Sequence, residues 1–305
     1  MKNNHKIFTV TKKEKLLEFL IDNATMTPKK LKSCLTHGQV TVDGVVKTKY
    51  DTPLENGQTV CIKPFGLKNV SENKLLNIIY EDTDIIVINK PTALLTVSSD
   101  NENERTAFHL LSEYVKRGNK DNRVFVVHRL DKDTSGVVLF AKNEGLKNLF
   151  QENWDSLVKY RGYLAIVQGK PNCNEERIVS YLKENAIHKV YVSEKEGDGK
   201  IAVTNYRISK TNGKYSLLRV WIETGRKNQI RVQLNSIGCP IIGDKRYGAS
   251  ESPLCRLGLH ADKLEIVHPC TGKLLKLEAS AGHKFMTFIA KSSDNKQNSE
   301  RDRKK

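Results

Sequence analysis

The opening of the chain has the hydrophobic pattern of two short helices followed by a hairpin. Residues 15–21 place apolar side chains at helical spacing. A second helix is predicted between Pro28, which suits a first turn, and Gly38, which suits a C-terminal stop. Residues 40–46 then read as a hairpin around an Asp-Gly pair, which accepts the positive φ of a tight turn. This pattern predicts a small α/β unit of its own that ends near residue 66.

The remainder of the chain is dominated by strand patterns, with helices interspersed irregularly. Apolar and β-branched runs predict strands at residues 84–89, 124–127, 137–141, 163–167, 202–208 and 216–222. Helical spacing predicts helices over residues 105–117 and 227–237. Because strict βαβ alternation is missing, we expect an α+β fold with a mixed, mainly antiparallel sheet.

These patterns also predict where the domains begin and end. We expect a polar linker over residues 67–75 and a larger domain over residues 76–291. The tail, residues 292–305, has no apolar residue, so we expect it to be disordered.

The net charge of the chain suggests a negatively charged partner. Lys and Arg number 51 against 35 Asp and Glu, a formal net charge of +16. Such a charge favours a polyanionic partner, either RNA, DNA or an acidic membrane. The second predicted helix adds a basic face formed by Lys29, Lys30 and Lys32. That face is either an RNA-binding surface or an ordinary solvated one.

Targeting and cysteine patterns narrow the setting. The chain has no apolar run of the roughly 18 to 20 residues that a membrane helix needs, and its N-terminus has no signal-peptide core. We therefore expect a cytoplasmic protein with no membrane partner. The six cysteines contain no C-x-x-C pair, which argues against a zinc ribbon and predicts no metal site. We interpret them as small, mostly buried hydrophobic residues.

The densest group of functional side chains occupies residues 128–136, between two predicted strands. Asp131 would stand at a strand end, held by the neighbouring Thr and Ser hydroxyls, and Gly136 would relax the backbone. This arrangement would present a carboxylate to a cleft. The alternative is a polar turn in which Asp131 or Asp133 caps backbone amides.

Two further groups carry possible chemistry. Arg226, Gln229 and Arg231 gather at the start of a predicted helix, where an N-terminus favours a phosphate or a carboxylate. Ordinary surface arginines are the alternative. His260 and His268 lie near strand ends, and we interpret both as structural histidines.

Taken together, these segments resemble one family in order and spacing, the RluA-type pseudouridine synthases. The likeness runs from about residue 76 to residue 288 and rests on five strings: "IIVINKPTALL", "HRLDKDTSGVVLFAKN", "YLAIVQG", "TGRKNQIRVQLNSIGCPIIGDKRYG" and "LGLHADKLEIVHPCTG". The string "MTPKKLKSCLTHGQVTVDGVVKTKYDTPLENGQTVCI" resembles an S4 RNA-binding domain over residues 8–64. The chain departs from the family at four sites: it has Asn228, Gln233 and Cys239 where His is common, and Thr92-Ala93-Leu94 where Gly commonly follows Lys-Pro.

The resemblance implies roles for individual residues. Asp131 would start the isomerisation by attacking or deprotonating the sugar, and Arg231 would form an ion pair with it. Tyr163 would pack against the target base. Arg129 would fill the space that the flipped nucleotide leaves. His128 and Arg226 would make further contacts with the RNA. The lysine face of the N-terminal unit (Lys29, Lys30 and Lys32) would add to the affinity for RNA.

The resemblance also implies a partner and a reaction class. It points to a pseudouridine synthase that acts as a monomer on structured RNA, first of all large-subunit ribosomal RNA, with transfer RNA as the alternative. No metal or organic cofactor is expected, because bonds break and form within one substrate. Two rivals stay open: a non-catalytic RNA-binding protein of ribosome assembly, and a hydrolase of small substrates. The charge of +16 speaks against the second.

Overall fold

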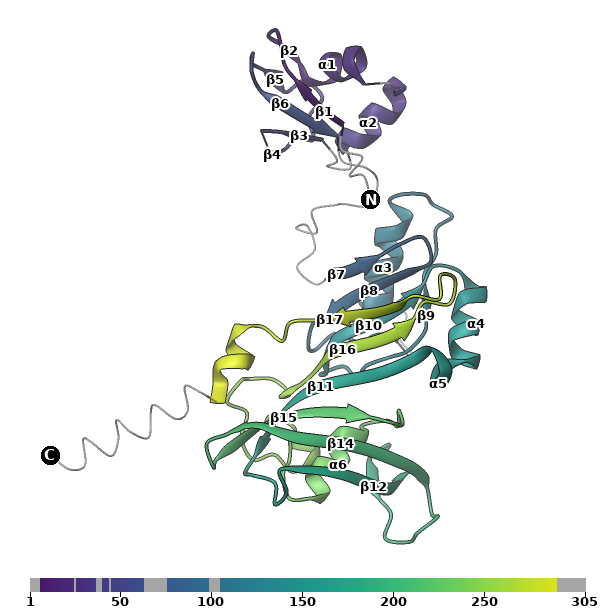
Figure 1. Ribbon diagram of the computed structural model, residues 1–305, viewed down its shortest axis with the longest axis vertical. Coiled ribbons are helices and arrows are strands. Elements are labelled where there is room, and N and C mark those ends of the chain that lie inside the picture. Colours follow the sequence, from purple (N-terminus) through teal and green to yellow (C-terminus); the bar gives the residue numbers. More distant parts are fainter. Residues whose placement is uncertain are drawn as a thin grey trace, which may run out of the picture. The chain divides into compact units, whose positions relative to one another are not determined.

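The computed structural model describes residues 6–24, 26–36, 40–43, 45–62, 76–98 and 105–289. The chain divides into two compact units, residues 1–74 and residues 75–305 (Figure 1). The expected linker, residues 67–75, and the expected tail, residues 292–305, lie outside the described residues.

The N-terminal unit contains the helices and the hairpin that the sequence predicts. Its elements are β1 (Lys6–Thr9), β2 (Glu14–Lys15), α1 (Leu16–Asn23), α2 (Pro28–Thr36), β3 (Val40–Val42), β4 (Val45–Val46), β5 (Pro53–Leu54) and β6 (Thr59–Ile62). Four strands form a sheet in the order β1-β6-β3-β4, and β2 pairs with β5. The hairpin turn places Asp43 at a φ of 48°. The Asp43 carboxylate accepts hydrogen bonds from the Thr59 N–H (2.8 Å) and Gln58 Nε2 (2.9 Å), which ties the turn to β6.

The apolar face of α2 is buried, as its spacing predicts. Leu31, Cys34 and Leu35 pack into the core of the N-terminal unit with α1 and the sheet. Lys32 is exposed. The side chains of Lys29 and Lys30 lie outside the described part of the chain.

The larger unit is built on one mixed sheet. Its strands are β7 (Asn77–Glu81), β8 (Ile85–Lys90), β9 (Phe125–Val126), β10 (Ser135–Ala141), β11 (Val158–Gln168), β12 (Glu175–Glu184), β13 (Val190–Val192), β14 (Lys200–Thr211), β15 (Tyr215–Ile222), β16 (Leu259–Val267) and β17 (Leu274–Glu278). They follow in the order β13-β12-β14-β15-β11-β16-β10-β8-β7, with β17 beside β16 and β9 beside β10 (Figure 1). β10 and β16 are parallel, and the other described pairs of this sheet are antiparallel. The predicted mixed, mainly antiparallel α+β fold is confirmed.

Helices cover the sheet on both faces. They are α3 (Ala107–Lys116), α4 (Glu144–Glu152), α5 (Trp154–Leu157) and α6 (Gln229–Ser236), with a 3₁₀ turn at Lys245–Tyr247 and a further helix over residues 283–289. Alternate residues of β8 face opposite sides: Ile86 and Ile88 pack with α3, whereas Ile85 and Val87 pack with α4. This two-sided burial explains why β8 is a continuous apolar run.

A close approach of two strands fixes the end of β10 that follows the Asp131 segment. Gly136 has a φ of +123°, and a Cβ built on it would lie 2.0 Å from the Ala261 carbonyl oxygen. Gly136 is the Cα partner of Ala261 in the parallel pair of β10 and β16. Glycine is therefore required at this position, because any side chain would push β16 away from β10.

The structure corrects one expectation about the cysteines. Cys34 and Cys239 are buried, but Cys173, Cys255 and Cys270 are exposed. The prediction that they are mostly buried is wrong, because turns and loop ends carry the exposed ones. In the part of the chain that the structure describes, none of the helices combines the length and apolar character needed to cross a membrane.

Candidate active site

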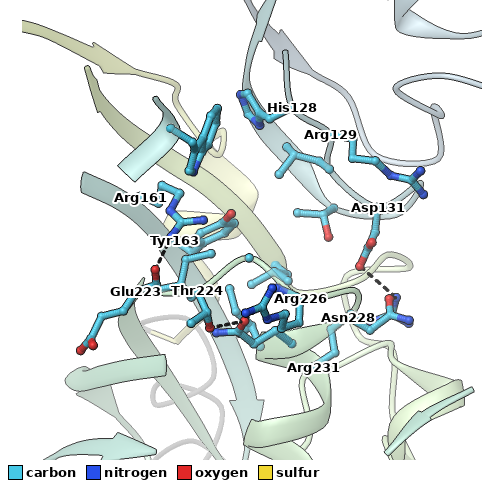
Figure 2. Close-up of a pocket in the computed structure, with 18 of the residues that line it drawn as sticks. His128, Arg129, Asp131, Arg161, Tyr163, Glu223, Thr224, Arg226, Asn228 and Arg231 are labelled. Carbon is cyan, nitrogen blue, oxygen red and sulfur yellow. Dashed lines mark hydrogen bonds and ion pairs between the residues drawn. The ribbon is translucent and has the colours of Figure 1, made fainter. Parts of the chain in front are cut away.

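A cavity of about 460 Å³ in the larger unit brings together the residues that the sequence singled out (Figure 2). Its walls come mainly from three segments: residues 128–134 before β10, residues 154–163 of α5 and β11, and residues 222–231 leading into α6. Asp131, Tyr163 and Arg231 all line it, although they are far apart in the sequence. The sheet order explains this, since β11 and β10 both flank β16.

Asp131 and Arg231 form the expected ion pair, but a loose one. Arg231 Nη1 lies 3.5 Å from Asp131 Oδ2, and 29% of the Asp131 side chain is exposed against 10% for Arg231 (Figure 2). The carboxylate thus faces a fixed cation and remains open to the cavity.

The principal partner of Arg231 is a residue that sequence reasoning missed. Asp244 accepts two hydrogen bonds from it, at 2.6 Å from Nε and 2.9 Å from Nη2, and its side chain is 1% exposed. Burial alone would lower the pKa of Arg231, but its hydrogen bonds with Asp244 and the charges of Asp244 and Asp131 raise that pKa above its ordinary value. A signal did exist: Asp244 is an acid directly after the apolar run Cys239–Gly243.

The remaining nitrogen of Arg231 is directed by Asn228 and Tyr247. Asn228 Oδ1 accepts a hydrogen bond from Arg231 Nη1 at 2.8 Å, and Asn228 Nδ2 donates to the Tyr247 hydroxyl at 3.1 Å. The Tyr247 ring lies 5.0 Å from the guanidinium carbon. Asn228 adopts a φ of 53°, a left-handed conformation that Asn tolerates better than most residues. Asn228 thus turns the free edge of Arg231 toward Asp131.

The backbone around Asp131 is bonded to side chains from the end of β8 and from the loop that follows it. Thr96 Oγ1 donates to the Leu130 carbonyl (3.0 Å) and accepts the Leu130 N–H (3.2 Å). Thr92 donates to the Asp133 carbonyl at 2.7 Å. Lys90 Nζ donates to the Lys132 carbonyl at 3.1 Å. Sequence reasoning missed these contacts because each joins residues more than 30 positions apart.

Lys90 is an unusual group in this position. Its side chain is fully buried, and Nζ also donates to the carbonyls of Leu94 (2.6 Å) and Pro91 (3.1 Å). Burial lowers the pKa of Lys90 to about 8, although the charges of Asp131 and Asp133 oppose this shift. The ammonium group therefore gathers three carbonyls in a dry environment.

The hydroxyl of Ser135 has a different role from the one that the sequence suggested. Ser135 Oγ donates to His260 Nδ1 at 2.7 Å, and His260 Nε2 donates to the Ala279 carbonyl at 3.0 Å. The prediction that Ser135 holds the Asp131 carboxylate is wrong, because the parallel pairing of β10 with β16 brings Ser135 opposite His260. His260 is a satisfied structural histidine, as predicted.

Aromatic and cationic groups form the opposite wall. Tyr163, on β11, has its pKa raised to about 12 by burial and by the charge of Asp131, although Arg161 opposes this shift. Arg161 donates to the Glu223 carbonyl at 2.6 Å and lies over the Trp154 ring, 6.0 Å from its centre. Arg161 and Trp154 line the cavity without having been predicted; both are side chains of the kind that contacts bases.

His128 lines the cavity but uses one ring nitrogen for the fold. Its Nε2 accepts the Leu139 N–H at 3.1 Å, and its ring packs 5.3 Å from Trp154. Burial and the charge of Arg161 lower the pKa of His128 to about 4, so the ring is neutral near pH 7. Only its other edge is left for a contact with RNA.

The group at the start of α6 is not one anion site. Gln229 is buried, and its amide bonds with Thr224, Val203, Thr204 and the Arg226 N–H. Gln229 is therefore a structural residue, which corrects its assignment as a donor to an anion. Arg226 and Arg129 are exposed and line the cavity.

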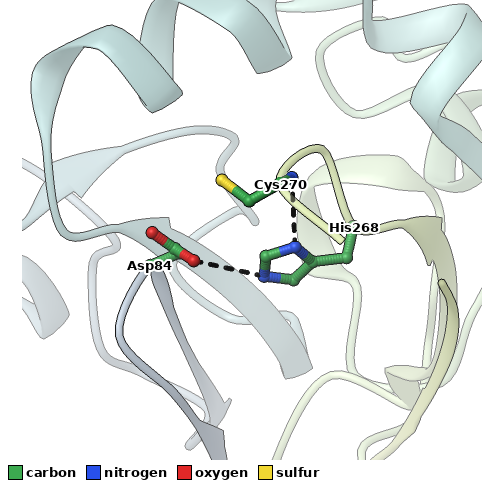
Figure 3. Close-up of side chains that lie close together, drawn as sticks. All are labelled: Asp84, His268 and Cys270. Carbon is green, nitrogen blue, oxygen red and sulfur yellow. Dashed lines mark hydrogen bonds and ion pairs between the residues drawn. The ribbon is translucent and has the colours of Figure 1, made fainter. Parts of the chain in front are cut away.

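A separate group of possible metal ligands lies away from the cavity. One ligand atom each from Asp84, His268 and Cys270 lie within 4.8 Å of one another (Figure 3). However, His268 Nδ1 accepts the backbone N–H groups of Cys270 (3.2 Å) and Thr271 (3.3 Å). In the neutral ring the proton must then sit on Nε2, which lies 3.2 Å from Asp82 Oδ2 without forming a hydrogen bond and offers no lone pair to a metal. This hydrogen bonding favours the structural role that the sequence suggested for His268 over metal ligation.

Comparisons with known proteins identify the family to which the chain is similar. The family model described as RNA pseudouridylate synthase matches residues 84–236. The chain is 34% identical over 206 residues to the uncharacterized RNA pseudouridine synthase YhcT of Bacillus subtilis, covering 67% of this chain and 68% of that protein. It is 33% identical over 219 residues to ribosomal large subunit pseudouridine synthase D of Borreliella burgdorferi, covering 70% of this chain and 65% of that protein. A solved structure, human RNA pseudouridylate synthase domain containing 4, shares the fold with a TM-score of 0.58 at 23% identity, covering 69% of this chain and 90% of that one.

Proposed function

Because this chain belongs to the RNA pseudouridylate synthase family, we propose that it is an isomerase that converts specific uridines of structured RNA to pseudouridine, with Asp131 as the catalytic carboxylate. The observation that carries the proposal is the position of Asp131. It faces the fixed guanidinium of Arg231 at 3.5 Å, yet 29% of its side chain is exposed in a cavity that Tyr163 also lines.

The reaction sets the requirements for this site. The bond between ribose C1′ and N1 of uracil breaks, the base turns, and a bond between C1′ and C5 forms. C5 loses a proton and N1 gains one, so the composition of the RNA is unchanged. A carboxylate can start this by attacking C1′ or by removing a proton from the sugar. Both routes need a negative charge on Asp131, which the permanently charged Arg231 stabilises.

The cavity must also hold a free uracil while the base turns. Its volume of about 460 Å³ lies in the range of small-molecule sites. We assign Tyr163 to pack against the base, with Trp154 and Arg161 extending the same wall of the cavity. Flipping the nucleotide out of a helix costs a few kcal/mol. We assign Arg129, which lines the cavity, to occupy the vacated space, since a guanidinium can stack on bases and bind phosphates.

For the target, we propose large-subunit ribosomal RNA, and transfer RNA as the second candidate. The first choice is supported by the similarity to the Borreliella burgdorferi protein, whose name states that substrate class. We assign the N-terminal unit, with its two helices and hairpin, to an S4-like role in RNA binding. We also propose that the protein acts as a monomer in the cytoplasm.

Pseudouridine mapping of total RNA tests the reaction and the target together. Cells that lack the protein would be rescued with the wild type, with Asp131→Asn, or with Asp133→Asn as a matched control from the same turn. We expect one or a few pseudouridines to disappear in the deletion strain and to return with the wild type and Asp133→Asn only. Restoration by Asp131→Asn would refute the catalytic assignment. If the deletion changes no site, and purified protein is inactive on ribosomal RNA fragments, the protein is a binding protein instead.

The RNA-binding role of the N-terminal unit has its own test. Replacing Lys29, Lys30 and Lys32 with Gln in the full chain should weaken binding of ribosomal RNA and reduce its salt dependence. A control variant would carry Gln at Lys195, Lys210 and Lys273, which are exposed on the larger unit. Equal losses in the two variants would show that net charge, and not this helix face, determines affinity.

A further inference from the structure

A second cavity of about 850 Å³ adjoins the first one. The two share five lining residues: Arg129, Leu130, Asp131, Asn228 and Arg231. The other walls of the second cavity come mainly from residues 95–97, 243–246 and 252–257. If an RNA strand placed a base in the first cavity, the backbone next to that nucleotide would therefore reach the second cavity.

Cations dominate the lining of this second cavity. It has seven Lys and Arg side chains against three Asp side chains. Several of the cations already have partners: Arg231 binds Asp244, Lys227 pairs with Glu184, and Arg246 donates to the His188 carbonyl at 2.6 Å. Only part of the positive charge is therefore neutralised within the protein.

Arg256 and Arg246 both donate to neutral acceptors, but Arg256 is partly buried whereas Arg246 is exposed. Within the described residues, the Arg256 guanidinium donates to neutral acceptors: the carbonyls of Leu257 (3.0 Å) and Leu259 (3.1 Å) and the Ser135 hydroxyl (2.6 Å). Among the described residues, no carboxylate lies within ion-pair distance of it. Burial lowers the pKa of Arg256, the direction expected for a cation without a counter-charge, but a guanidinium keeps its proton near neutral pH.

The orientation of Arg256 is fixed before any ligand binds. The Ser135 hydroxyl that accepts its hydrogen bond donates in turn to His260, and His260 donates to the Ala279 carbonyl. The guanidinium also packs 5.5 Å from the centre of the Phe285 ring. A cation held in this way needs little reorganisation to bind an anion. It is also bonded to Ser135, the first residue of β10, which follows the turn that carries Asp131.

We propose that the second cavity binds a backbone phosphate next to the target uridine, with Arg256 as its principal cation. This inference rests on the proposed function for its ligand, RNA. A phosphodiester fits the site because it is the anion that any RNA strand carries on both sides of the flipped nucleotide. Its charge would be matched by a guanidinium that the protein leaves without a carboxylate.

The first test compares the salt dependence of RNA binding between variants. Polyuridylic acid is the probe, so that the unknown target sequence does not matter. Arg256→Met should lower affinity about tenfold and reduce the slope of log K against log salt by about one, the change expected for one lost phosphate contact. Arg256→Lys should keep most of the slope. Lys210→Met removes an equal charge from an exposed site on β14 and should change the slope less. Equal effects of Arg256→Met and Lys210→Met would overturn the proposal.

The second test uses the wild-type protein, so it stands even if Arg256→Met folds poorly. The probe is a nine-nucleotide RNA with one central uridine between adenosines. Neutral methylphosphonate linkages would replace the phosphates on either side of the uridine, or, as a control, those at the two ends. The proposal requires a loss of affinity of about tenfold for the central replacement and a smaller loss for the terminal one. No difference between the two RNAs would refute it.

Failure of this inference can be told apart from failure of the proposed function. If the wild type forms no pseudouridine in ribosomal RNA but the central phosphates still matter, the isomerase assignment falls and the phosphate site stands. If the enzyme is active and the central phosphates do not matter, the phosphate site alone falls. A merely structural role for Arg256 would lower the melting temperature of Arg256→Met without making the variant insensitive to loss of the central phosphates.

Discussion

Arg231 contacts two carboxylates, Asp244 and Asp131, which differ in burial and in hydrogen bonding. Asp244 is 1% exposed and accepts two hydrogen bonds, at 2.6 and 2.9 Å. Asp131 is 29% exposed and meets a single nitrogen at 3.5 Å. Both are aspartates on the same guanidinium, so the difference lies in burial and geometry. One carboxylate fixes the cation, which leaves the other free to engage a substrate.

The difference between Asp244 and Asp131 is tested most directly by neutralising each carboxylate in turn. Asp244→Asn leaves a buried guanidinium without its counter-charge, so we expect a loss of about 3–5 kcal/mol in the free energy of unfolding. Asp131→Asn should cost no more than about 1 kcal/mol, because that pair is partly exposed and loosely bonded. Urea unfolding measures both. Asp198→Asn, which disrupts an exposed pair with Lys183, is the control and should resemble Asp131→Asn. Equal losses for Asp131 and Asp244 would mean that the two carboxylates share one role.

A conservative change of the cation sharpens the same distinction. Arg231→Lys keeps the charge but cannot bridge Asp244, Asn228 and Asp131 at once. We expect turnover to fall about a hundredfold, the scale for losing one positioned electrostatic group, while RNA affinity changes little. Single-turnover assays on ribosomal RNA, with binding measured separately, give the two quantities. Wild-type turnover in this variant would show that charge alone is sufficient beside Asp131.

Asp131 differs from Asp244 in a further respect. The position of Asp131 depends on its backbone turn, and Lys90 donates a hydrogen bond to that turn. The pKa of Lys90 is lowered from 10.5 to about 8, so between these values the unfolded chain holds a proton that the folded chain has released. The free energy of unfolding should therefore rise with pH above about pH 8, by about 2 kcal/mol up to pH 10. Below pH 8 both states are protonated and this contribution is constant. Tyr163, with its pKa raised to about 12, acts in the opposite direction above pH 10, which limits the useful range.

Comparison with Lys90→Met isolates this contribution. Urea unfolding of both proteins at pH 7, 8, 9 and 10 should show a rise that the variant lacks. Parallel curves would mean that Lys90 does not titrate in this range.

The smallest expected effect concerns the loop that supports the Asp131 turn. Ala93 has a φ of 61°, a left-handed conformation that costs a residue with a Cβ about 1–2 kcal/mol. Ala93→Gly should stabilise the protein by about 0.5–1 kcal/mol, because glycine removes this strain but adds entropy to the unfolded chain. Ala249→Gly, at a position outside the positive-φ region, should instead destabilise it slightly. Thermal unfolding distinguishes the two, and a loss of stability in Ala93→Gly would contradict the strain.

Much of the fold could be predicted from the sequence, because local patterns carry it. The period of apolar residues gave the helices α1, α2, α3 and α6 and most of the long strands, to within a few residues. Apolar spacing did not delimit the strands β7, β12, β13, β16 and β17 or the helices α4 and α5. β12 and β17 are mostly exposed, so their alternation is weak. α4 buries two of its nine residues, and α5 spans only four residues and buries none of them.

The candidate site could likewise be predicted only in part from the sequence. Contiguous strings of the sequence carried the family resemblance, and this was sufficient to assign Asp131, Tyr163 and Arg231 to one site. Three contacts became visible only in three dimensions. Asp244 accepts hydrogen bonds from Arg231, Lys90 donates to a carbonyl of the Asp131 turn, and Ser135 donates to His260. Each of these is a pairing of buried polar groups, and a buried polar group must find whichever partner the strand order brings within reach. Ser135 and His260 are 125 residues apart, and the parallel register of β10 and β16 alone places them side by side.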